Sequence, residues 1–451
     1  MKTSATAGAG IAVCALLAAL VPFGATSANP RPIWIRAARS GAAPKACSTN
    51  YPPHSFVGYS GEGNVAGSDD SGVLAGADDF VCDTGAAQAG GDVSTIAAGG
   101  SDAFMGATTG SSIDGTDGFI GAGQIGTISG AESFVGAGSE PAVAGNDAAV
   151  GAGVVDSASG SGSFVGAGGS LNAQTSEAPE DVVSGQDSFA GAGDENTVSG
   201  DDSFDGAGKL NAISAAAMDA SIASGDGNAV SAEYAAILGG YGNSASSSYG
   251  IVAGGIDDTA AGVLAFALGY HADASHNGSF VWSDYISGSA TIKDTAANQF
   301  ITRASGGVTF SSNEAGTSGV SLTPGSGTWA SLSDRNAKTG IVPLDDATVL
   351  AKVTALPLGT WSYTSEPGVR HIGPMAQDFF TAFGAGVDDR HITTVDEDGV
   401  ALAAIKGLHH ALEGTRTQQQ RVAANEDTEL AALSAETQKL DAIVAKLSQA
   451  R

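Results

Sequence analysis

The chain of 451 residues is acidic and rich in glycine: it holds 66 glycines, and 48 Asp and Glu stand against 19 Lys and Arg, a net charge of −29. The glycines follow no Gly-x-y period, which excludes collagen, and the many alanines and valines exclude a wholly disordered chain. Between Ser55 and Ala274 the only Lys or Arg is Lys209. That surface would repel phosphate groups, so nucleic acid and anionic membranes are excluded as partners there.

The N-terminus has the pattern of an export signal. Lys2 precedes the apolar run "GIAVCALLAALVPF", and the small residues "TSA" follow just before Asn29. The run is too short to span a bilayer comfortably, so we expect residues 1–28 to be cleaved rather than to anchor the chain. The mature protein would then be extracytoplasmic, secreted or at a cell surface, with no integral membrane segment.

Residues 29–54 are expected to form a linker that contains Cys47. An oxidising compartment would permit a bridge from Cys47 to Cys82, but the spacing fits two unpaired thiols equally well. The sequence leaves both possibilities open.

A repeat of 15 residues occupies the expected head, 55–274. It is most regular in segments such as "DGFIGAGQIGTISG" and "QDSFAGAGDENTVSG", where the aromatic residue recurs at the same step. Fifteen residues accommodate two short strands and two turns, with glycine supplying positive φ angles and serine, asparagine and aspartate the turn hydrogen bonds. A fixed period of this kind predicts a solenoid whose apolar outer positions are covered by further copies of the chain.

The head repeats resemble those of trimeric autotransporter adhesins, as in "TVSGDDSFDGAG" and "YGNSASSSYGIVAGG". The resemblance implies a mainly β fold, a left-handed parallel β-roll, associated as a homotrimer. The string "GAGQIG" inside the repeat matches the dinucleotide fingerprint only formally, since no helix can begin there. We therefore expect no cofactor.

The second half changes character twice. Residues 275–332 contain short strands with glycine turns and are expected to form a β-rich neck. Residues 333–412 mix helices and strands, an α+β domain, and residues 413–451 end one long helix. A four-and-three spacing of mostly apolar residues predicts a coiled coil near the end of that helix, at Leu433, Thr437, Leu440, Val444 and Leu447.

Three ordered motifs, "SDRNAK", "RHIGPMAQD" and "DEDGVALAAIKGL", resemble the endosialidase-type intramolecular chaperone, a self-cleaving serine peptidase family of phage tail spikes and fibres. The resemblance implies autoproteolysis between Leu332 and Ser333. Ser333 would be the nucleophile and Lys338 the base that accepts its proton. His371 and Gln377 match residues of the same family and are expected to support the site.

Residue chemistry allows that reaction under one condition. A lysine accepts a proton only in its neutral form, which burial or a positive neighbour favours. Residues five apart do not share a face of a helix or strand, so Ser333 and Lys338 can meet only across a turn or between chains. The structural alternative is that Ser333 caps a helix and Lys338 is a solvated charge.

Together these features predict an exported, trimeric, adhesin-like fibre that assembles with a C-terminal chaperone and then releases it. Two alternatives stay open: a permanent, uncleaved trimerisation clamp, and a phage-type receptor-binding tail fibre. No metal site is expected, since the adjacent His409 and His410 on a helix are poorly placed to share a metal. The ligand of the head, and how the fibre attaches to a surface, are not predicted.

Overall fold

The computed structural model describes residues 54–58, 63–169 and 181–449. The expected signal at 1–28, almost all of the linker, and Cys47 lie outside these residues. Cys82 is disulfide-bonded, and its partner also lies outside them. The chain divides between Ala304 and Ser305 into two compact units, which we describe separately.

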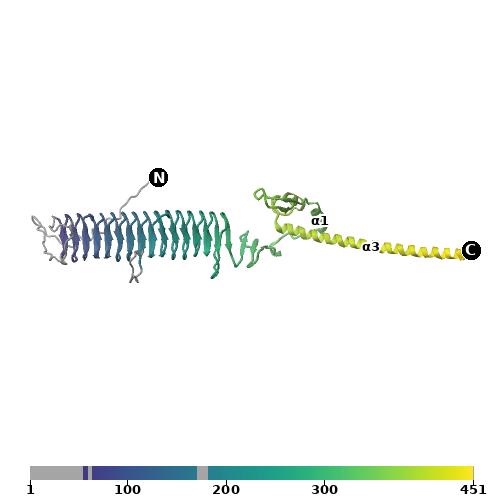
Figure 1. Ribbon diagram of the computed structural model, residues 1–451, viewed down its shortest axis with the longest axis horizontal. Helices are drawn as coiled ribbons and strands as arrows, with labels where there is room; N and C mark the ends of the chain where they lie inside the picture. The colour runs from purple at the N-terminus through teal and green to yellow at the C-terminus, as the bar shows by residue number, and fades with distance from the viewer. Residues whose placement is uncertain (1–53, 59–62, 170–180, 450–451) are drawn as a thin grey trace. The chain divides into compact units, whose positions relative to one another are not determined.

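The first unit is a parallel β-solenoid, visible in Figure 1 as a row of stacked rungs. Each rung contributes strands to two sheets. In the described residues the first sheet has 17 strands: β1 (Phe56–Val57), β3 (Gly72–Val73), β5 (Ala87–Asp92), β7 (Phe104–Thr109), β9 (Phe119–Gln124), β11 (Phe134–Val135), β13 (Ala149–Gly153), β15 (Phe164–Gly168), β17 (Phe189–Asp194), β19 (Phe204–Asp205), β20 (Gly208–Lys209), β22 (Ser221–Ile222), β24 (Ala236–Ile237), β26 (Ile251–Ile256), β28 (Phe266–Tyr270), β30 (Phe280–Ser283) and β32 (Phe300–Arg303).

The second sheet has 15 strands, most of them two residues long. They are β2 (Val65–Ala66), β4 (Phe80–Val81), β6 (Thr95–Ile96), β8 (Ser112–Ile113), β10 (Thr127–Ile128), β12 (Ala142–Val143), β14 (Ser157–Ala158), β16 (Asp181–Val183), β18 (Asn196–Val198), β21 (Ala212–Ile213), β23 (Ala229–Val230), β25 (Ser244–Ala245), β27 (Thr259–Ala260), β29 (Ala272–Ala274) and β31 (Ile292–Lys293).

The register confirms the predicted solenoid and its 15-residue step. Phe119 pairs with Phe134, and Phe134 pairs with Ala149, always in parallel. The parallel pairing also continues past Ala274, the expected end of the head. Phe280 pairs with Phe300, so the rungs run on through Arg303.

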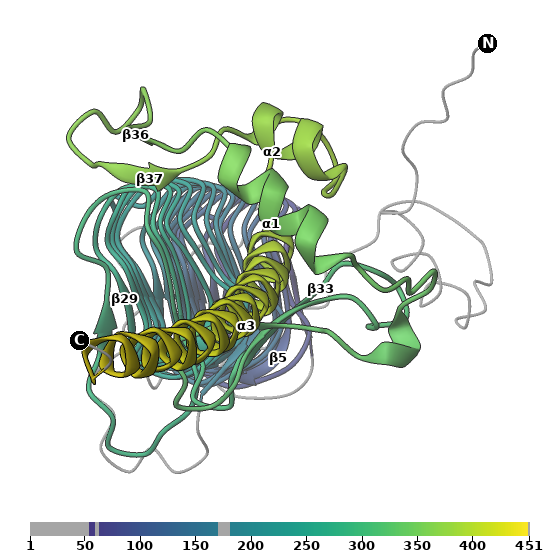
Figure 2. The same cartoon turned by 90° about the vertical axis from the view of Figure 1, so that its right-hand side faces the viewer.

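Figure 2 shows the coil of the solenoid end-on. A narrow apolar core of buried side chains fills its inside. Most strands send one small or medium apolar side chain inward, for example Val135, Val150 and Val165, all fully buried. These stack from rung to rung because each rung repeats the same inward position. Their combined burial is the main source of stability for a coil too thin to hold larger side chains.

A ladder of buried amides runs beside that core. The side-chain Oδ1 of Asn196 accepts the backbone N–H of Asn211 at 3.1 Å, and Asn211 does the same for Asn228 at 3.2 Å. Asn228 and Asn243 continue the pattern towards Asp258. The ladder satisfies backbone groups at a bend inside the coil, where water cannot reach them.

Half-exposed aromatic rings form a stripe along the outside of the first sheet. Within it Phe119 and Phe134 stack in parallel, with ring centroids 5.2 Å apart. Tyr234 and Tyr249 lie at the adjoining corner, two residues before β24 and β26, and stack with centroids 5.0 Å apart; at these two rungs Ala236 and Ile251 take the place of phenylalanine on the sheet. The aromatic stripe consists of Phe104, Phe119, Phe134, Phe164, Phe189, Phe204, Tyr234, Tyr249, Phe266, Phe280 and Phe300.

A glycine lies two residues after each stripe phenylalanine from Phe104 to Phe204, and at four of these glycines an added Cβ would meet the ring of that phenylalanine. A Cβ on Gly191 would lie 3.0 Å from a ring carbon of Phe189 and 2.0 Å from the carbonyl oxygen of Gly206. The recurring "FxGAG" therefore has a packing reason: only glycine lets the ring lie on the sheet.

The second unit starts with a small antiparallel sheet and ends with a long helix. Its first three strands are β33 (Val308–Ser311), β34 (Gly319–Leu322) and β35 (Trp329–Ser331). A 3₁₀ turn, η1 (Arg335–Ala337), follows, and then α1 (Asp346–Ala355), β36 (Gly359–Trp361), β37 (His371–Gly373), α2 (Ala376–Phe383) and α3 (Thr394–Gln449).

The start of α3 packs on α1. Val349 of α1 and Ala403 and Ala404 of α3 are buried together, and Lys406 forms an ion pair with Asp346 at 3.2 Å. Beyond this contact the predicted coiled-coil positions, such as Leu440 and Leu447, are exposed on a single chain. None of the described helices is both long and apolar enough for a transmembrane span.

Candidate functional site

The predicted cleavage point lies where the small antiparallel sheet ends. Strand β35 pairs with β34, and one further hydrogen bond, from the backbone N–H of Leu332 to the carbonyl of Gly319 at 3.3 Å, extends that pairing by a residue. The carbonyl side of the bond between Leu332 and Ser333 thus belongs to a strand, and the amide side belongs to the turn that follows.

The turn brings the two predicted catalytic side chains together. Asp334 caps the 3₁₀ turn: its carboxylate accepts the backbone N–H of Asn336 at 2.9 Å. The chain reverses over Arg335–Ala337, and the backbone N–H of Lys338 closes the turn on the carbonyl of Arg335. As a result, Lys338 Nζ lies 2.7 Å from Ser333 Oγ. Of the two geometries that the spacing allows, the single chain adopts the one across a turn.

This distance fits direct proton transfer between the hydroxyl and the amine. The surroundings of the pair do not yet fit that role, because every residue from 327 to 345 is exposed. A single chain therefore does not supply the burial that would favour a neutral lysine.

The two predicted supporting residues lie elsewhere in this unit. His371 is on β37, opposite Trp361 of β36, and its ring stacks on the indole with centroids 4.7 Å apart. Gln377 is the second residue of α2 and is exposed. In the part of the chain that the structure describes, no hydrogen bond, ion pair or ring contact joins residues 327–345 to His371 or Gln377.

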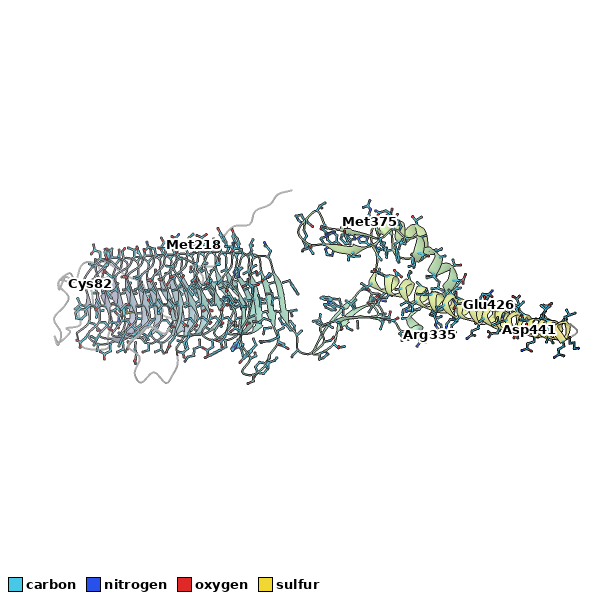
Figure 3. All side chains as sticks on the ribbon, turned by 45° about the vertical axis from the view of Figure 1, so that its right-hand side comes forward. Cys82, Met218, Arg335, Met375, Glu426 and Asp441 are labelled. Atoms are coloured by element: carbon cyan, nitrogen blue, oxygen red, sulfur yellow. The ribbon has the colours of Figure 1, made fainter. Side chains whose placement is uncertain are left out.

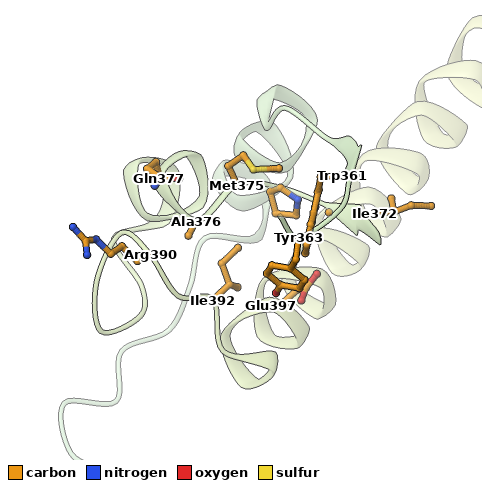
Figure 4. Close-up of a pocket in the computed structure, with 11 residues that line it drawn as sticks. Trp361, Tyr363, Ile372, Met375, Ala376, Gln377, Arg390, Ile392 and Glu397 are labelled. Carbon is orange, nitrogen blue, oxygen red and sulfur yellow. The ribbon is translucent and has the colours of Figure 1, made fainter. Parts of the chain in front are cut away.

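Gln377 lines a pocket of about 390 Å³, drawn in Figure 4. Its wall combines apolar and aromatic side chains with one positive and one negative group. The lining residues are Trp361, Tyr363, Ile372, Gly373, Pro374, Met375, Ala376, Gln377, Arg390, Ile392 and Glu397. We call this space the α2 pocket.

A local hydrogen-bonded turn presents Arg390 to the α2 pocket. The carboxylate of Asp388 accepts the backbone N–H groups of Arg390 and His391, both at 2.9 Å, and contacts the His391 ring. The hydrogen bond from the Arg390 N–H and the contact with His391 lower the pKa of Asp388 below its ordinary value. The loop is therefore held by an ionised carboxylate near neutral pH.

The sequence did not point to the α2 pocket as a whole. Trp361 and Tyr363 alternate on a predicted strand, which places them on one face, and that pattern alone could have marked them as a pair. Their contact with His371 depends on the pairing of β36 with β37, and Arg390 and Glu397 come from later elements. No short motif spans all of these segments.

Residues 333–388 match the family model described as the chaperone of endosialidase. This segment is an endosialidase chaperone domain. The matched residues begin at Ser333 and include the turn, α1, both strands β36 and β37, and α2. No curated protein matches the chain.

The chaperone domain and the parallel solenoid together fit a phage tail fibre-like protein. Within the described residues, no group of three or more His, Cys, Asp or Glu side chains is placed to hold a metal ion.

Proposed function

We propose that this protein is an exported, trimeric fibre whose chaperone domain assembles the solenoid and then releases itself by cutting the bond between Leu332 and Ser333. The observation that carries the proposal is the 2.7 Å contact between Lys338 Nζ and Ser333 Oγ at the first residue of the matched domain. The hydroxyl stands next to the bond that it would attack.

The proposed reaction is an acyl transfer followed by hydrolysis. Lys338 takes the hydroxyl proton as Ser333 Oγ attacks the carbonyl carbon of Leu332, and the proton passes to the amide nitrogen of Ser333 as the C–N bond breaks. Water then hydrolyses the resulting ester. The products are a carboxylate at Leu332 and a free amine at Ser333, so one water is consumed for one peptide bond.

Two exposed apolar surfaces support assembly from several copies. The aromatic stripe runs along the solenoid, and the seam with Leu433, Leu440 and Leu447 runs along α3; both are unpartnered in one chain. An apolar seam of this spacing is typical of a coiled coil. Each surface repeats along its element, so a straight partner with the same repeat, namely another copy, fits both.

A chaperone domain that assists assembly and is then removed would solve a folding problem of parallel solenoids. Parallel pairing between rungs is non-local, at about 15 residues per step, and the rungs are so alike that misregistered association between copies is a hazard. A helix that gathers the chains first limits that hazard. Removing the domain afterwards makes assembly hard to reverse, which gives kinetic rather than equilibrium stability.

The test compares the wild-type chain with Ser333→Ala by denaturing electrophoresis. We expect the wild type to yield the 119-residue piece from Ser333 to Arg451 and the variant to stay intact. Ser331→Ala is the matched control, since this exposed serine lies two residues before the proposed nucleophile and should leave cutting unchanged. An intact wild-type chain would leave the domain as a permanent clamp and remove the peptidase from the proposal.

A further inference from the structure

We propose that the self-cleaving site is shared between copies: the α2 pocket of one chain receives the segment around Leu332 and Ser333 of its neighbour. This inference rests on the proposed function and adds the partner that completes the site. The nucleophile and base come from one chain, and the groups that bury and orient them come from another.

The first half-site is the exposed segment that carries Ser333 and Lys338. Residues 327–345 are all exposed, although several of them are large and apolar. Trp329, the first residue of β35, is 54% exposed, and Leu332, whose carbonyl belongs to the scissile bond, is 51% exposed. Apolar side chains grouped in this way mark a surface that a partner covers.

The second half-site is a pocket with unused polar groups. The indole nitrogen of Trp361, a lining residue, is buried without a hydrogen-bond partner, and so is Nε2 of His371, which stacks on that indole but does not line the pocket. An indole N–H can only donate, so burying it without an acceptor costs free energy. A polypeptide segment placed in the α2 pocket brings carbonyl oxygens, which are the acceptors that this site lacks.

The charges of the two half-sites are complementary. Asp334 and Arg335 stand beside the scissile bond, and Arg390 and Glu397 line the pocket. Among the described residues, neither member of either pair takes part in an ion pair. Docking one copy on the next can therefore pair Asp334 with Arg390 and Arg335 with Glu397, which also fixes the orientation of the segment.

The two half-sites do not meet within one chain. Figure 3 labels Arg335, next to the catalytic pair, and Met375, at the pocket, and the two lie on different sides of α3. The family match nevertheless spans both, because it begins at Ser333 and includes His371 and Gln377. A second copy reconciles these two facts without requiring the chain to refold.

Docking would change the chemistry of the segment in two ways. It would bury Lys338 against the pocket wall, which favours the neutral amine that can act as a base. It would also bring the Gln377 amide N–H to the carbonyl oxygen of Leu332, where negative charge develops as Ser333 attacks. Cutting would then wait for assembly, because a lone chain lacks the second half-site.

The experiment mixes two chains that are each defective alone. The first carries Ser333→Ala and keeps its pocket; the second carries Gln377→Ala and keeps its nucleophile. The chains bear different tags and are co-expressed, and the released C-terminal pieces are identified by mass. Gln377 is exposed, so its truncation leaves the fold intact.

We expect trimers of Gln377→Ala alone to cut at least tenfold more slowly than wild type. When the two chains are made in equal amounts and trimers form at random, about half of all Gln377→Ala chains should regain cutting. In a ring of head-to-tail contacts each chain meets one neighbour, and half of these neighbours carry an intact pocket. The Ser333→Ala chains should stay whole. Normal cutting by Gln377→Ala alone, or mixed trimers without rescue, would overturn the inference.

A charge exchange tests the same contact without truncating the pocket. Arg335→Glu should slow cutting, and Glu397→Arg added to the same chain should restore it, because each copy would again offer opposite charges to its neighbour. Equal slowing by the single and double variants counts against the shared site. If the wild-type chain never cuts, the proposed function itself fails, which is a different outcome from a wild type that cuts but shows no rescue.

Discussion

The carboxyl group of Asp205 is buried in the apolar core of the solenoid, and this burial changes its pKa. Asp205 occupies an inward position that is alanine in the rung before it, Ala190, and isoleucine in the rung after it, Ile222. Burial, with a smaller contribution from the charge of Asp181, raises the pKa of Asp205 to about 7. In an unfolded chain an aspartate has a pKa near 3.9.

This shift predicts a pH dependence with a definite sign. Between about pH 4 and pH 7 the folded chain keeps the Asp205 proton and the unfolded chain loses it, so the free energy of unfolding falls as pH rises through that range. The loss is complete above the folded-state pKa and amounts to at most about 4 kcal/mol.

Asp205→Asn removes the charge and should therefore stabilise the solenoid at pH 8 but hardly at pH 4. Chemical denaturation of both proteins at the two pH values measures the difference. Asp202→Asn, at an exposed position, is the control and should change little at either pH. If the free energies of unfolding of wild type and Asp205→Asn differ by the same amount at pH 4 and pH 8, the assigned pKa is refuted.

Part of the net negative charge lies at one corner of the solenoid. One corner of the coil needs a left-handed residue in every rung, and aspartate takes it at Asp102, Asp117, Asp147 and Asp187, with φ between 52° and 57°. We expected glycine to supply all such angles. Aspartate tolerates this conformation better than most residues, and at a corner its charge stays in water.

At the scale of elements, the contact between α1 and α3 depends on one glycine. A Cβ on Gly407 would lie 2.3 Å from the carbonyl oxygen of Asp346 and 3.0 Å from Cβ of Leu350. The helix α3 can approach the N-terminal turn of α1 only because that atom is absent. This contact anchors the long helix in the chaperone domain.

Gly407→Ala should destabilise the contact between α1 and α3 by about 1–3 kcal/mol, although alanine has the better helix propensity. Hydrogen exchange of the α1 amides in the full-length protein reports the change as faster exchange. Gly414 lies on the same helix with open space around it, so Gly414→Ala is the matched control. It should raise the stability of the helix by up to about 1 kcal/mol. Unchanged α1 exchange in Gly407→Ala would show that the helices can separate without cost.

The elements differ in how far sequence could predict them. The period of 15 fixes the rung register, because inward, outward and corner positions repeat together, as Phe119 and Phe134 show. The long helix follows from its spacing of apolar residues. The α2 pocket could not be predicted, since Trp361, Gln377 and Glu397 meet only through the tertiary arrangement of three elements.

The turn that holds the proposed catalytic pair lies between these cases. The spacing of Ser333 and Lys338 required a turn or a second chain, and the cap by Asp334 produces the turn. What the spacing could not predict is that both side chains would remain exposed. The end of the solenoid was likewise expected too early, because the longer rungs after Ala274 interrupt the period while the parallel pairing continues.

At the scale of the whole molecule, the account requires copies to associate along the aromatic stripe. Phe119→Glu combined with Phe134→Glu places charge on a surface that we expect to be buried between solenoids, and should weaken the trimer. Sedimentation velocity checks the outcome as a shift towards smaller species. Ser129→Glu, on the exposed face of the other sheet, adds the same charge and should leave the assembly unchanged.

Equal sedimentation of the Phe119→Glu, Phe134→Glu protein and the Ser129→Glu control would place the interface elsewhere on the rod. The exposed seam of α3 would then be the main contact between copies. Such a result would leave the self-cleaving site untouched, because the chaperone domain lies outside the solenoid.

The central claim is that assembly triggers cutting before Ser333. The most direct measurement is the intact mass of the purified full-length protein, taken under native and then denaturing conditions. The account predicts a native trimer of chains that end at Leu332, with the piece from Ser333 to Arg451 detected as a separate species. A folded native trimer whose denatured chains all keep the full-length mass would contradict it.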